Sequence, residues 1–164
     1  MFIKKLEIFF ISMMIISVLV LLTNWYNNYV FKNTPISQDI VKLIESKEQE
    51  VLINMQKNYG FTYKFPLIIT DKIQSRLYGV TSYERGGEIK IYLNKKVMQE
   101  SLDYILDTVI AHEYAHALLF KQNAYRSRGD GHTPLWKETC DKLGGINCEQ
   151  YVNHKDVVMG KMPF

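Results

Sequence analysis

Residues 101–121 read SLDYILDTVIAHEYAHALLFK, and this stretch decides both the fold and the site. Ser101 suits a helix start, and apolar residues follow at helical spacing. They are Leu102, Ile105, Leu106, Val109 and Ile110. One helix is therefore predicted from Ser101 to about Lys121. His112 and His116 are four residues apart, so they share one face of this helix and their imidazoles can converge on one metal ion.

Glu113 follows the first histidine, where a carboxylate can reach a metal-bound water without itself being a ligand. It can accept a proton as that water attacks an amide carbon. Zinc lowers the pKa of such a water toward about 7 and polarises the carbonyl. The five-residue pattern also occurs by chance, and the alternative is a pair of hydrogen-bonded, partly buried histidines. The helical setting and a further histidine downstream favour the metal site.

Catalytic zinc takes three protein ligands and keeps a position open for water, so a third ligand is expected downstream. The metzincin pattern would place glycine at position 119 and histidine at position 122, but the chain has Leu119 and Gln122, which excludes that class. The remaining candidates are His132, Glu138 and His154. His132 is favoured because a glycine-containing turn ahead of a helix lets its imidazole swing back toward the motif.

The rest of the soluble part predicts an α+β fold. Helical spacing runs from Ile36 to Asn58-Tyr59-Gly60, and Thr133-Pro134 to Gly144-Gly145 bound another helix. Three segments are predicted as strands of a small antiparallel sheet, with a turn at 84–87 between the last two. They are residues 65–70, 76–83 and 88–94.

His112-Glu113-Tyr114-Ala115-His116-Ala117, followed by Gly131-His132-Thr133-Pro134-Leu135-Trp136, resembles the SprT-like metallopeptidase domain. Gly79-Val80 and the hairpin to residues 89–93 resemble it too, and the resemblance covers residues 37–145. It implies a zincin-like fold in which His112, His116 and His132 bind Zn²⁺ and Glu113 is the general base. Thr133 replaces the usual glycine, and the four-cysteine zinc ribbon of some relatives is absent. Regions by which some relatives bind nucleic acid are not visible either.

Residues 8–22, IFFISMMIISVLVLL, form an uncharged apolar block behind Lys4 and Lys5. Extended to Tyr26, a helix would rise roughly 28 Å, close to the thickness of a bilayer core. The sequence predicts a cytoplasmic segment at 1–7, a transmembrane helix at 8–26 and a linker at 27–36. Residues 146–164 form a tail. A cleaved signal peptide is the alternative, although no small-x-small cleavage site is evident. The lysines favour a single-pass protein whose catalytic domain is extracytoplasmic.

The formal charge of +3 on 164 residues gives no indication of a nucleic-acid partner. Cys140 and Cys148 can form one disulfide if the domain faces an oxidising compartment, and two free thiols fit the spacing equally well. Asp130 is a candidate for orienting a zinc-bound imidazole, and Tyr83 or Tyr125 for stabilising an oxyanion.

Together these features predict a membrane-tethered zinc metalloendopeptidase acting on protein or peptide substrates. Two other readings stay open. One is a membrane-tethered binding or scaffold module with a structural zinc site, and the other is a DNA-associated SprT-type protease.

Overall fold

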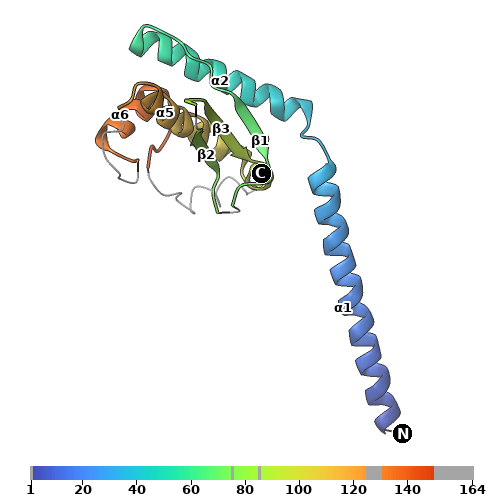
Figure 1. The fold of residues 1–164 in the computed structure, drawn as a ribbon. Coiled ribbons are helices and arrows are strands. Elements are labelled where there is room, and N and C mark those ends of the chain that lie inside the picture. Colours follow the sequence, from blue (N-terminus) through green and yellow to red (C-terminus); the bar gives the residue numbers. More distant parts are fainter. Residues whose placement is uncertain (1, 75, 85, 125–130, 150–164) are drawn as a thin grey trace. The chain divides into compact units, whose positions relative to one another are not determined.

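A computed structural model describes residues 2–74, 76–84, 86–124 and 131–149, and the chain divides into two compact units, Met1–Ser37 and Gln38–Phe164 (Figure 1). The first unit is a single helix, α1 (Phe2–Asn33). Residues Ile3–Asn33 are long and apolar enough to cross a membrane, which makes α1 a candidate membrane span. Its 32 residues correspond to about 48 Å of helix, more than the bilayer core alone requires.

Helix α1 extends beyond the predicted transmembrane boundaries, so residues 27–33 of the predicted linker are helical. Residues 27–33 contain neither glycine nor proline, and the first proline of the chain is Pro35. Nothing within residues 27–33 therefore breaks the helix. Trp25 stacks on Tyr29 one turn later, and the Asn33 side chain donates a hydrogen bond to the Tyr29 carbonyl at 2.8 Å. Only residues 34–37 separate α1 from the next helix.

The second unit begins with α2 (Gln38–Tyr59), which ends at Gly60 as predicted, with φ of 76° at the glycine. Its buried stripe is Ile44, Glu48, Val51, Leu52 and Met55. Three strands follow, β1 (Leu67–Thr70), β2 (Gly79–Tyr83) and β3 (Ile89–Asn94). One face of β3 is apolar and buried, and it is made of Ile89, Ile91 and Leu93.

The sheet is mixed, so the prediction of an antiparallel sheet is wrong in part. Its strand order is β1-β3-β2, with β2 antiparallel to β3 across the predicted turn and β1 parallel to β3. The chain leaves β1, crosses to the far side of β3, forms β2 and returns through a hairpin. Strand β3 therefore lies between β1 and β2 and runs in the same direction as β1. The α+β class is retained, and the zincin-like description stays a prediction.

The predicted helix at 101–121 exists, with an unpredicted π-helical turn inside it. Helix α3 (Lys95–Glu100) precedes α4 (Leu102–Tyr104), the π turn η1 (Ile105–Val109) and α5 (Ile110–Lys121). The Ile110 N–H donates to the Ile105 carbonyl, five residues back. Ile146 returns from the C-terminal side to this turn, where its N–H donates to the Asp107 carbonyl at 3.0 Å and its carbonyl accepts from Thr108 Oγ1 at 2.8 Å.

Helix α5 is the core helix of the unit. Eight of its twelve residues are buried, and it packs against β2, β3, α2 and α6 (Figure 1). A buried polar contact joins it to α2: the Tyr114 hydroxyl donates to Glu48 Oε1 at 2.6 Å, and Lys64 Nζ lies 2.8 Å from Glu48 Oε2. Because a buried carboxylate is costly without partners, this contact fixes the rotation of α5 about its axis.

Helix α6 (Pro134–Lys142) begins and ends where the sequence predicts. Thr133 caps it by accepting the Trp136 N–H at 3.2 Å, and Pro134 occupies the first turn. Gly144, with φ of 91°, follows the C-terminal end.

Candidate metal centre

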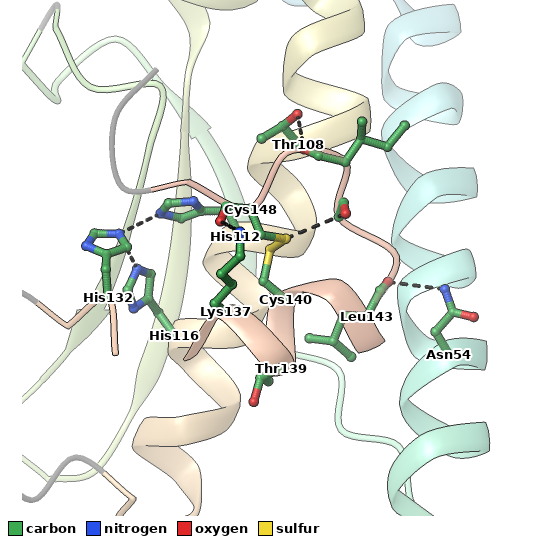
Figure 2. The surroundings of a disulfide bond; sticks show 12 residues. Asn54, Thr108, His112, His116, His132, Lys137, Thr139, Cys140, Leu143 and Cys148 are labelled. Carbon is green, nitrogen blue, oxygen red and sulfur yellow. Dashed lines mark hydrogen bonds between the residues drawn. A yellow bond between two sulfur atoms is a disulfide. The ribbon is translucent and has the colours of Figure 1, made fainter. Parts of the chain in front are cut away.

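Three imidazoles from two parts of the chain meet at one point. His112 and His116 come from α5, and His132 comes from the segment directly ahead of α6. His132 Nε2 lies 3.2 Å from His116 Nε2 and 3.2 Å from His112 Nε2, as Figure 2 shows. These ring nitrogens form the one group of this kind among the described residues, all within 4.8 Å of one another. The structure thus brings His132 to the helix motif, as predicted.

The spacing of the nitrogens fits a single metal ion. Zinc binds histidine nitrogen at about 2.0–2.1 Å with tetrahedral geometry, which separates two nitrogen ligands by about 3.3 Å. The 3.2 Å separations match that value. Burial lowers the pKa of His112 and of His116 to about 3 each, with smaller contributions from the neighbouring imidazoles. Both rings are therefore neutral near pH 7, the state in which imidazole binds metals.

The position of His132 is set by α6 and by a disulfide at the other end of that helix. Gly131, the residue before His132, has φ of 83°. Thr133, the residue after it, caps α6. At the end of α6, Cys140 is bonded to Cys148, so the question of pairing is answered in favour of the bridge. Closing this short loop lowers the conformational entropy of the unfolded chain, which stabilises the folded state by about 2–3 kcal/mol.

The disulfide loop also contacts the start of the metal-bearing helix (Figure 2). A Cβ on Gly145 would lie 2.7 Å from both sulfurs and 3.2 Å from the Cβ of Ala111, the residue before His112. Lys137 Nζ donates to the Cys148 carbonyl at 2.9 Å. With the two hydrogen bonds of Ile146 to the π turn, these contacts join the helix that follows His132 to the helix that carries His112 and His116.

Glu113, the residue that follows His112 on α5, is buried and is held by strand β2. Thr81 Oγ1 lies 2.7 Å from Glu113 Oε2 and 2.9 Å from the Glu113 carbonyl oxygen. Gly79 leaves room for the carboxylate: a Cβ there would lie 2.8 Å from Glu113 Cγ and 2.8 Å from Val109 Cγ1. Burial raises the pKa of Glu113 to about 7, and the hydrogen bond with Thr81 opposes that rise.

Gly79 and Thr81 are site residues that the sequence reasoning missed. The family resemblance includes Gly79 but implies no role for it, and Thr81 lies 32 residues from Glu113. A signal for Gly79 existed, because a glycine at the first position of a strand marks a close approach of another group. Asn94 stabilises the segment that leads into β2. It is fully buried, and its side chain donates to the Leu77 carbonyl at 2.7 Å.

The other sequence candidates do not join the cluster. Glu138 is exposed and pairs with Lys142 Nζ at 2.7 Å, and it is not in the group of converging side chains. Tyr83 is exposed and stacks on Phe120, with ring centroids 5.7 Å apart. His154, Asp130 and Tyr125 lie outside the described residues.

A sequence model of the SprT-like family matches residues 21–155, which is most of the chain and extends beyond the 37–145 range of the predicted resemblance. No curated protein matches the chain. The matched range contains all three histidines of the cluster, Glu113 and both cysteines. The chain belongs to the SprT-like family.

Proposed function

We propose that this chain is a zinc-dependent metallopeptidase in which His112, His116 and His132 bind Zn²⁺ and Glu113 is the general base. The observation that carries the proposal is the convergence of three Nε2 atoms at separations that suit one ion. Membership of the SprT-like family supports a metallopeptidase role. The buried carboxylate of Glu113, the residue that follows His112, is the kind of group that peptide hydrolysis requires.

The number of ligands favours a catalytic site over a structural one. Structural zinc is normally enclosed by four protein ligands, whereas catalytic zinc has three and an open position. Within the described ranges, only three metal-binding side chains converge. Cys140 and Cys148, which would otherwise be good zinc ligands, are bonded to each other. This pattern argues against the alternative of a scaffold module with a closed zinc site.

When bound, zinc would supply a Lewis acid that lowers the pKa of a water and polarises the scissile carbonyl. The protein's own part is proton transfer. Glu113 accepts the proton of the attacking water on its carboxylate and delivers it to the amide nitrogen as the carbon–nitrogen bond breaks. Gly79 and Thr81 keep this carboxylate against β2, where it has few alternative rotamers.

Thr81 has one hydroxyl proton and two acceptors within reach, Glu113 Oε2 and the Glu113 carbonyl oxygen. While Glu113 is charged, the hydroxyl donates to Oε2. When the other carboxylate oxygen, Oε1, takes up the proton, Oε2 remains an acceptor for the same hydroxyl. Both protonation states of Glu113 therefore keep a hydrogen-bond partner through the reaction.

Glu113→Gln is expected to retain zinc but to lose peptidase activity on an unfolded, fluorescently labelled protein by at least about a hundredfold, because glutamine cannot accept the proton. Zinc content and initial rates are measured on the full chain in detergent. Glu138→Gln, at an exposed glutamate on α6, is the matched control and should behave as wild type. A zinc-loaded Glu113→Gln protein with full activity would show that Glu113 is not the base.

Thr81→Val should lower kcat by about tenfold with little change in KM, since it removes a hydrogen bond to a buried carboxylate worth about 1–3 kcal/mol. Thr81→Ser keeps the hydroxyl and should recover most of the rate. Valine lacks the hydroxyl and leaves the buried carboxylate without this partner, so its thermal unfolding temperature should also fall, whereas that of the serine variant should change less. Equal kcat for the valine and serine variants would contradict the positioning role.

We further propose that α1 anchors the protein in a membrane with a cytoplasmic N-terminus and an extracytoplasmic catalytic domain. Lys4 and Lys5 precede the apolar stretch, which favours that orientation. The Cys140–Cys148 disulfide adds support, because disulfides persist outside the reducing cytoplasm. Substrates would then be proteins or peptides on the outer side of the membrane.

In sealed membrane vesicles with the outer face exposed, added protease is expected to remove a C-terminal epitope tag while an N-terminal tag survives. Lysis of the vesicles should then expose the N-terminal tag as well. Protection of the C-terminal tag until lysis would reverse the proposed orientation. Release of the protein by carbonate washing would show that α1 is not a membrane span.

A further inference from the structure

Trp136 is in ring contact with all three histidines of the cluster. Its ring centroid lies 4.6 Å from that of His112, 5.2 Å from that of His116 and 4.5 Å from that of His132. The side chain is 1% exposed. A single indole thus touches two ligands from α5 and the ligand that arrives from the segment ahead of α6. No function described so far uses it.

The local sequence explains how the indole reaches this place. Thr133 caps α6, and Trp136 lies three residues later. The backbone N–H of Trp136 donates to the Thr133 hydroxyl. Long side chains on a helix lean toward its N-terminus, which is the end where His132 lies. The spacing from His132 to Trp136 therefore places the ligand and the ring next to each other without help from the rest of the fold.

The ring geometry distinguishes the three contacts. His116 is stacked on the indole with an interplanar angle of 24°, whereas His112 and His132 meet it edge-on, at 68° and 84°. Offset stacked and edge-to-face pairs are the favourable arrangements of aromatic rings. Each contact restricts the tilt of one imidazole, so together they fix the directions of three ring nitrogens. An aromatic face also attracts positive charge, which the imidazoles acquire when they bind a divalent cation.

We propose that Trp136 is a positioning residue that holds His112, His116 and His132 in the geometry for one divalent metal ion and stabilises the loaded site through its π face. This inference rests on the metal site of the proposed function and adds a residue to it. Outer-shell partners of this kind contribute about tenfold to a hundredfold to metal affinity.

Two substitutions of Trp136 separate the effect of apolar packing from the effect of the aromatic face. Trp136 Nε1 is buried and has no hydrogen-bond partner among the residues that the structure describes. Phenylalanine keeps an aromatic face and removes this unsatisfied donor, while leucine is apolar and removes the face as well. Trp136→Phe is therefore the conservative variant, and Trp136→Leu is the test of the π face.

Zinc affinity is measured on the full chain in detergent by competition with a chromophoric chelator. Trp136→Leu should bind zinc about tenfold to a hundredfold more weakly than wild type, and Trp136→Phe should recover to within about threefold. Leu135→Ala, at the exposed neighbouring position on α6, is the control and should not change the affinity. Wild-type affinity in Trp136→Leu, or equal weakening by phenylalanine and leucine, would overturn the proposal.

A second measurement leaves the core intact, in case the leucine variant fails to fold. The chain contains two tryptophans, Trp25 and Trp136, so Trp25→Phe leaves Trp136 as the one tryptophan emitter. Cobalt(II) should quench this emission with a break at one equivalent, and a chelator should restore it. His132→Ala in the same background should abolish the quenching. Stoichiometric cobalt binding without quenching would contradict contact between Trp136 and the loaded ligands.

These readouts are independent of peptidase activity. A protein in which Glu113→Gln remained active would refute the proposed base while leaving the affinity and fluorescence results in place. Unchanged metal affinity in Trp136→Leu would refute the role of the indole alone.

Discussion

Burial of α5 is the constraint on which the rest of the structure depends. The same helix packs on the sheet, contacts α2 and α6, and carries His112, Glu113 and His116. Because most of its residues are buried, it cannot rotate without disrupting the core. The buried contact between Tyr114 and Glu48 fixes its rotation further. The geometry of the histidines is therefore a consequence of core packing.

Two attachments complete the site on this rigid helix. Strand β2 approaches closely at Gly79, and Thr81 holds the Glu113 carboxylate. The segment directly ahead of α6 supplies His132 and α6 itself supplies Trp136, while the disulfide loop joins the C-terminal end of α6 to the π turn ahead of His112. The base and two of the ligands share α5, but the Glu113 carboxylate has its own partner on β2, so a variant of Thr81 can change proton transfer without changing metal binding.

Features set by local sequence were predictable, and features set by distant contacts were not. His112 and His116 share a helix face because of their spacing, and Thr133-Pro134 with Gly144 bound α6 through capping chemistry. His132 was favoured by its turn, although its meeting with α5 depends on tertiary packing. The parallel pairing of β1 with β3, the pairing of Thr81 with Glu113 and the π turn depend on partners far along the chain. The polar and aromatic residues 27–33 predict a linker by composition, while ring stacking and a side-chain hydrogen bond accompany their helical structure.

The central claim is that His132 completes the metal centre, and zinc stoichiometry of the purified full-length chain tests it most directly. Elemental analysis should find one zinc per chain in the wild type and in Glu138→Ala, and strongly reduced zinc in His132→Ala, because two imidazoles alone hold the ion weakly. Full zinc in His132→Ala together with loss of zinc in Glu138→Ala would contradict the account.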